Sequence, residues 1–98
     1  MDDVRFAWDQ NKAKANLRKH GVSFEEAETV FADDNALLQD DPDHSLDEDR
    51  GILLGLSAKT RLLVVVHTLR DDGRTIRVIS ARRATRSEQR QYLDRIDR

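Results

Sequence analysis

The protein has 98 residues, 38% of them hydrophobic and 37% charged, and this length predicts a single domain over residues 1–98. It has no cysteine, which excludes disulfides, thiolate nucleophiles and cysteine-ligated zinc and fits a reducing cytoplasm. No apolar run approaches the ~20 residues of a membrane helix, and no basic stretch precedes an apolar one at the start, so we expect neither a membrane span nor a secretory signal.

The net charge of −2 is unevenly distributed along the chain. Residues 1–50 carry a net charge of −8 and residues 51–98 one of +6. All but one of the basic side chains in the second half are arginine, whose planar donor fork suits phosphate. The second half therefore suggests a polyanionic ligand, whereas the acidic half suits solubility, folding or a basic partner.

The first elements are a strand and a helix. Residues 4–8 contain Val, Phe and Trp in loose alternation, which predicts a short strand. Asp9 is typical of a helix N-cap, and Gly21 stands where a glycine ends a helix. The residues between them favour a helix over positions 10–20.

A second helix is expected directly afterwards. Ser23 and Glu26 have the spacing of a capping box. The predicted apolar face of this helix consists of Phe24, Ala27, Val30 and Phe31. Residues 36–39 can form a strand, and residues 40–49 form an acidic segment with the only proline, which predicts a loop or a sheet edge.

Three further strands are expected in the second half. Residues 52–56 and 62–68 are apolar runs of strand length, and the latter suits a central strand buried on both faces. Residues 57–61 connect them. Residues 71–73, with the sequence Asp-Asp-Gly, predict a hairpin turn before a last strand over residues 75–81.

The chain ends in a predicted helix. Thr85 and Glu88 form a second capping box, and the expected apolar side carries Tyr92, Leu93 and Ile96. The order is β-α-α-β-β-β-β-α, which predicts an α+β fold. We expect an antiparallel sheet of about four to five strands with two N-terminal helices and one C-terminal helix.

One candidate site is a cluster of arginines in the last third of the chain. Several guanidinium groups at a sheet edge and a helix start suit a phosphate cradle. The alternative is a solvated helix face in which arginines pair with Glu88 or Asp94. The cluster consists of Arg61, Arg77, Arg82, Arg83, Arg86 and Arg90.

A second candidate lies in the acidic segment. His44, Glu48 and Arg50 could combine proton transfer with stabilisation of an anion. The alternative is an acidic surface loop. A calcium loop starting at Asp41 is excluded, because Leu46 stands where glycine is needed and Ile52 where glutamate is needed.

The first predicted helix carries a third candidate. Lys12, Asn16, Lys19 and His20 share one helix face, which can contact RNA or can be the wet side of an amphipathic helix. His67, within an apolar strand, is expected to be a hydrogen-bonded core or flank histidine rather than a catalyst. No phosphate-binding glycine loop, G-x-S-x-G or H-E-x-x-H motif occurs, and we expect no metal site and no cofactor.

Several segments, in order, resemble the BrnT family of type II toxins over about residues 5–93. They are Phe6-Ala7-Trp8-Asp9-Gln10-Asn11-Lys12, the run 16–27 from Asn16 to Ala27, Val30-Phe31, Asp41-Pro42-Asp43-His44-Ser45, Gly55-Leu56-Ser57, Arg61-Leu62-Leu63-Val64-Val65 and the run 76–84 from Ile76 to Ala84. The resemblance implies a RelE-like fold and a ribonuclease that halts translation. It also implies a BrnA-type antitoxin, with operator DNA bound through the toxin–antitoxin complex.

RNA supplies its own nucleophile, the 2′-hydroxyl, so its cleavage needs groups that move protons and stabilise charge on phosphate. The predicted catalytic residues are Arg61, Arg82, Arg83, His44, Glu48 and Arg50. The predicted RNA-binding residues are Lys12, Lys19, Arg77, Arg86 and Tyr92. The alternatives are a module that binds nucleic acid or a partner without catalysis, and a degenerate toxin kept as a subunit of a complex.

Overall fold

Strands and helices follow one another in the predicted order in the computed structural model, which describes residues 3–42 and 49–97. The elements are β1 (Arg5–Ala7), α1 (Gln10–His20), α2 (Phe24–Thr29), the 3-10 helix η1 (Val30–Ala32), β2 (Leu37–Asp40), β3 (Arg50–Leu56), β4 (Leu62–Arg70), β5 (Thr75–Arg83) and α3 (Arg86–Ile96). The α+β class is confirmed, and most predicted boundaries agree within two residues. The last strand extends two residues further, to Arg83.

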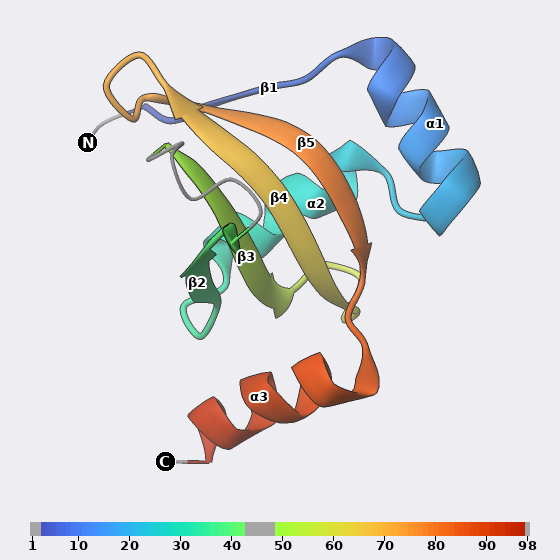
Figure 1. Ribbon diagram of the computed structural model, residues 1–98, viewed down its shortest axis with the longest axis vertical. Coiled ribbons are helices and arrows are strands. Elements are labelled where there is room, and N and C mark those ends of the chain that lie inside the picture. Colours follow the sequence, from blue (N-terminus) through green and yellow to red (C-terminus); the bar gives the residue numbers. More distant parts are fainter. Residues whose placement is uncertain (1–2, 43–48, 98) are drawn as a thin grey trace.

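The five strands form one sheet in the order β1-β5-β4-β3-β2 (Figure 1). The pairs from β2 to β5 are antiparallel, as expected. β1 instead pairs in parallel with β5, so the sheet is mixed. The chain between β1 and β5 contains the other three strands and two α-helices, a connection long enough for a parallel pair.

Local capping signals fix where the helices begin and end. The Asp9 carboxylate accepts a hydrogen bond from the backbone N–H of Lys12 at 3.0 Å, and Gly21 ends α1 with φ of 69°. The capping box at the start of α3 is complete. The box predicted at Ser23 is only half formed. The Ser23 hydroxyl caps the N–H of Glu26, but the Glu26 side chain turns into the protein to bind elsewhere.

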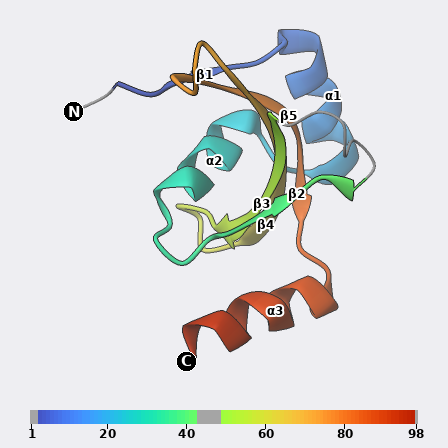
Figure 2. The same cartoon turned by 60° about the vertical axis from the view of Figure 1, so that its left-hand side comes forward.

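The main core lies between α2 and the sheet. Figures 1 and 2 show α2 across one face of the sheet and α3 at the opposite end of the molecule from β1. The buried core residues are Val22, Phe24, Ala27, Val30, Leu53, Leu63, Val65, Val78 and Ala81. His67 also points to this face and is buried, with its ring centroid 4.9 Å from that of Phe31. Its predicted place in the core is confirmed.

α3 forms a smaller core on the other side of the sheet. Tyr92 packs with Leu54, Val64 and Ala84. The predicted apolar side of this helix is only partly correct, because Leu93 is 54% exposed and Ile96 is 44% exposed. Tyr92 is the only buried residue of α3, and Leu93 and Ile96 beside it remain in solvent.

The predicted hairpin turn joins β4 to β5. Asp71, Asp72 and Gly73 all have positive φ, at 53°, 57° and 85°. Aspartate tolerates this left-handed region better than most residues, and glycine adopts it freely. Within the described part of the chain, no helix is long and apolar enough to cross a membrane.

Candidate functional site: an arginine row on the sheet

The face of the sheet turned away from α2, which we call the second face, carries charged and polar side chains beside the small apolar core under Tyr92. Successive strand residues point to opposite faces. Because His67 points towards α2, its neighbour Thr68 belongs to the second face. Tyr92 of α3 covers the end of this face near Leu54 and Val64. Thr68 lies further along β4, beyond that small core.

Thr68 stands between two arginines from the neighbouring strands. Arg50 of β3 and Arg77 of β5 are its direct cross-strand partners. Side chains of such partners point to the same face with Cβ atoms ~5 Å apart. We call Arg50, Thr68 and Arg77 the arginine row. Residues 27 positions apart in the sequence are thus brought within reach of a single anion.

The two arginines of the row differ in their partners. The Nε of Arg50 donates to Asp41 Oδ2 at 2.8 Å, and the side chain of Asp41 is only 8% exposed. In the described part of the chain, no carboxylate pairs with Arg77, which is half-buried. Asp41 therefore offsets part of the positive charge of the row and orients Arg50, while Arg77 keeps its full charge for a ligand.

Arg82 also belongs to the second face, but it is engaged by α3. Its Nη1 and Nη2 donate to the two carboxylate oxygens of Glu88 at 2.8 and 2.9 Å. The pairing expected as the alternative to a phosphate cradle is therefore present at this arginine. Arg77 and Arg82 are separated by roughly 15 Å of strand, so they would contact different phosphates.

The Arg82–Glu88 pair gives the protein an acid-sensitive contact. The hydrogen bonds from Arg82 lower the pKa of Glu88 from 4.5 to about 2. A carboxyl whose pKa is lower in the folded state stabilises the fold above its unfolded pKa and loses that contribution as the pH falls. We expect Glu88→Gln to reduce the fall in unfolding free energy between pH 4.5 and about 2. Denaturant unfolding at several pH values measures the unfolding free energy of both proteins. An equal decrease of this free energy with falling pH in both proteins would contradict the prediction.

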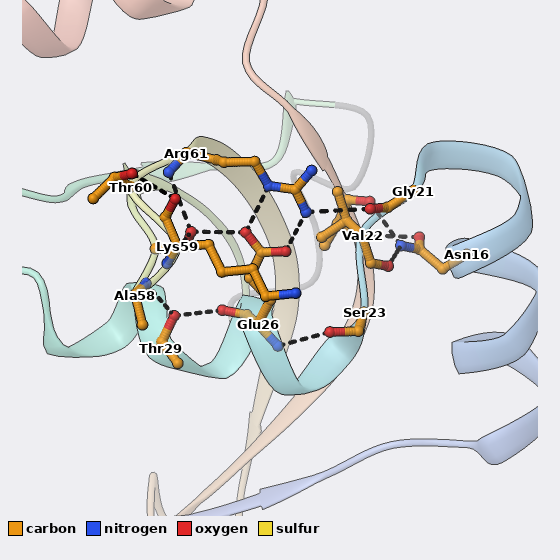
Figure 3. A network of polar contacts seen from close by, with 12 residues as sticks. Asn16, Gly21, Val22, Ser23, Glu26, Thr29, Ala58, Lys59, Thr60 and Arg61 are labelled. Carbon is orange, nitrogen blue, oxygen red and sulfur yellow. Dashed lines mark hydrogen bonds and ion pairs between the residues drawn. The ribbon is translucent and has the colours of Figure 1, made fainter.

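Arg61 lies apart from the arginine row, in a network around buried Glu26 (Figure 3). The Nε of Arg61 and the hydroxyl of Ser57 donate to Glu26 Oε2 at 2.9 and 2.7 Å, and Nη2 of Arg61 contacts Oε1. The same Nη2 donates to the carbonyl of Gly21 at 3.2 Å. The hydrogen bond from Arg61 holds the pKa of Glu26 below its usual value. This network ties α2 to the turn before β4.

Three other predicted site residues lie near α3, and the structure does not bring them into the row. Tyr92 is buried, and its hydroxyl donates to Asp33 Oδ2 at 2.8 Å. Burial and the contact with Asp33 raise the pKa of Tyr92 to about 12, so the phenol stays protonated. Arg83 follows Arg82 on β5 and by alternation points to the opposite face. Arg86 is exposed at the start of α3.

The predicted stripe on α1 is interrupted. Lys12 and Lys19 are exposed, but Asn16 between them is buried. Its amide donates to the carbonyls of Val22 and Ala81 and accepts from the N–H of Ala81. β1 pairs only with the first residues of β5, so Asn16 completes the edge of β5 beyond that point. Asn16 therefore stabilises the fold and is not available to bind RNA.

Two predicted catalytic residues, His44 and Glu48, lie outside the described residues. Among residues 3–42 and 49–97 there is no group of three histidine, cysteine or acidic side chains arranged to hold a metal ion. Thr68 was missed by the sequence reasoning. Its cross-strand neighbours come from distant segments, and the only local signal is a hydroxyl-bearing residue at the end of an otherwise apolar run.

Comparisons with known proteins agree with this architecture. No match was found among curated protein sequences. A structure search found the crystal structure of the Brucella abortus ribonuclease toxin BrnT, with a TM-score of 0.66 and 22% sequence identity. The match covers 85% of this chain and 99% of that chain, which establishes a shared fold.

The sequence itself gives the family. The family described as "Ribonuclease toxin, BrnT, of type II toxin-antitoxin system" matches residues 8–88, a span that runs from the end of β1 into α3 and includes the whole arginine row. This chain therefore belongs to the BrnT family of ribonuclease toxins of type II toxin–antitoxin systems.

Proposed function

We propose that this toxin cleaves RNA by attack of the substrate's own 2′-hydroxyl, without a metal ion, and so inhibits translation and growth in the cytoplasm. The observation that carries the proposal is the arginine row. Two guanidinium groups flank one point of the second face, and no carboxylate in the described residues pairs with Arg77. Such a site attracts a phosphodiester and favours the extra negative charge of its transition state.

The proposed reaction is a transesterification. The 2′-oxygen loses its proton and attacks phosphorus while the bond from phosphorus to the 5′-oxygen breaks. The leaving 5′-oxygen takes up a proton. The products are a 2′,3′-cyclic phosphate and a 5′-hydroxyl end. Because negative charge on the phosphoryl oxygens grows during attack, donors fixed beside those oxygens contribute most to the rate.

The residue roles follow from their surroundings. Arg50 and Arg77 bind the phosphate that reacts, and Asp41 keeps Arg50 in place through its 2.8 Å contact. Arg82 binds a neighbouring phosphate, held in orientation by Glu88. Lys12, Lys19, Arg83 and Arg86 are exposed cations that add long-range attraction for RNA. Proton transfer is assigned to His44 and Glu48 on sequence grounds alone.

The predicted catalytic role of Arg61 and the predicted RNA-binding role of Tyr92 are left out of this proposal, and Arg83 is assigned to long-range attraction instead of catalysis. Arg61 is engaged with Glu26, Ser57 and Gly21 away from the row, and we assign it to the fold. Tyr92 is buried with its hydroxyl bound to Asp33, so we assign it to the α3 core.

The test uses purified protein and a defined RNA in excess chelator. We expect new RNA ends carrying a 2′,3′-cyclic phosphate and a 5′-hydroxyl. A substrate with one 2′-deoxynucleotide at the mapped position should resist cleavage there, because its nucleophile is missing. The same RNA under translation in a bacterial extract shows whether ribosomes are needed. Cleavage that requires a divalent metal, or that proceeds at the 2′-deoxy position, would contradict the proposed chemistry.

A type II toxin works with an antitoxin protein, and the family assignment implies such a partner. We propose that this partner is a BrnA-type antitoxin and that the complex, rather than the toxin alone, binds operator DNA. Co-expression and co-purification with a BrnA-type protein tests the first part. Operator binding by the complex but not by the toxin alone tests the second.

A further inference from the structure

The hydroxyl of Thr68 is a buried donor without a partner. Thr68 is only 7% exposed, and its Oγ1 has no hydrogen-bond partner. Other buried polar side chains in the described part of the chain, such as Asn16, Glu26 and Ser57, form hydrogen bonds. A buried polar group without a hydrogen-bond partner destabilises the folded state, so stability does not explain why this position carries a hydroxyl.

Packing alone does not explain a threonine at this position. β4 is otherwise built mainly from valine and leucine, and valine has nearly the shape of threonine without its hydroxyl. Valine also suits a strand at least as well. The hydroxyl therefore adds nothing to the interior contacts that a methyl group would not add. A hydroxyl that binds a ligand, rather than another group of the protein, explains the threonine better.

The position of the hydroxyl suggests what binds it. Thr68 lies between Arg50 and Arg77, so the donor sits at the middle of a positively charged row. A hydroxyl can donate to an anion and turn to suit it. Asp41 is bound to Arg50, and no carboxylate of the described residues pairs with Arg77.

We propose that the Thr68 hydroxyl is a substrate-binding group that donates a hydrogen bond to a phosphoryl oxygen of the RNA held between Arg50 and Arg77. The inference rests on the proposed function and adds a third donor to its phosphate site. The flanking arginine side chains are long and half-buried. As they turn toward the phosphate, the hydroxyl between them becomes accessible to the same anion.

The test compares Thr68→Val, which removes only the hydroxyl, with Thr68→Ser, which keeps it. The probe is a short RNA made uncleavable by 2′-O-methyl groups, and its binding is measured by fluorescence anisotropy. We expect Thr68→Val to weaken binding about tenfold or more, since hydrogen bonds to charged groups are among the stronger ones. Thr68→Ser should bind within about threefold of the original protein.

Stability separates this role from a structural one. Because the hydroxyl has no partner in the fold, Thr68→Val should unfold at the same or a higher denaturant concentration than the original protein. Loss of stability in Thr68→Val that Thr68→Ser restores would show a bond within the protein and overturn the inference.

The outcomes also distinguish the inference from the proposed function. If the original protein cuts RNA and Thr68→Val binds the probe equally well, the inference is wrong and the function stands. If the original protein binds the probe but cuts no RNA, catalysis is wrong, and weaker binding by Thr68→Val still supports the site. If the original protein binds no RNA at all, both are wrong.

Discussion

Arg77→Ala is expected to lower the rate of RNA cleavage by roughly 100- to 1,000-fold, the loss seen when one donor to a developing anion is removed. Arg77 is the arginine of the row that no described carboxylate neutralises. Its charge should therefore act on the phosphate rather than on the fold. Single-turnover cleavage of a defined RNA measures the effect on chemistry separately from product release.

The matched control is Arg18→Ala, which removes the same charge from an exposed position on α1. We expect it to change cleavage by less than about threefold, in proportion to its small share of the long-range attraction for RNA. Both variants should keep the original circular dichroism spectrum and unfolding midpoint. Equal losses in the two variants would mean that overall charge, and not the arginine row, governs the reaction.

Glu26→Ala is expected to lower the free energy of unfolding by about 3 kcal/mol. Its side chain is 1% exposed and accepts hydrogen bonds from Ser57 and Arg61. Removing the carboxylate leaves both donors without their acceptor and opens a gap between α2 and the turn before β4. Urea unfolding followed by circular dichroism measures the loss.

Glu25→Ala is the control on the same helix, because Glu25 is exposed. It should change stability by no more than about 0.5 kcal/mol. Arg61→Ala should also destabilise, and the double variant should lose less than the sum of the two single changes, because the residues share one interaction. Additive losses of stability would show that Glu26 and Arg61 do not stabilise the fold together. An Arg61→Ala protein that keeps its stability but no longer cuts RNA would show that Arg61 acts in catalysis.

The sequence predicted the features that depend on neighbouring residues. Asp9 and Gly21 bound α1, Thr85 opens α3, and the Asp-Asp-Gly turn joins the last two strands, because each of these signals acts within a few residues. Apolar runs likewise located the central strands. These signals sufficed for the order of elements and for the fold class.

Contacts between distant residues were beyond such reasoning. Glu26 has the spacing of a capping residue, yet its carboxylate binds Arg61, 35 positions away. Asn16 looks like part of a wet helix face, yet it completes the edge of β5 through Ala81, 65 positions away. Spacing along one helix cannot reveal either partner, because Arg61 lies in the turn before β4 and Ala81 lies in β5.

The candidate site was likewise predictable only in part from the sequence. The arginine-rich character of the second half was visible in the composition, but the distribution of arginines over two faces was not. The pairing register separates Arg77 from Arg61 and brings it beside Thr68 and Arg50. A shift of one strand by one residue would move its side chains to the opposite face of the sheet. The site therefore depends on the pairing register between strands, which the pattern of residues along one strand does not specify.

The most direct test of the arginine row is to locate bound RNA on the protein in solution. Side-chain Nε–Hε signals of the arginines can be followed by NMR while the uncleavable 2′-O-methyl RNA is added. We expect the signals of Arg50 and Arg77 to shift first and furthest, that of Arg82 to follow, and those of Arg18 and Arg61 to stay in place. Shifts confined to Arg18 and to the backbone of α1 would contradict the site and place RNA on α1 instead.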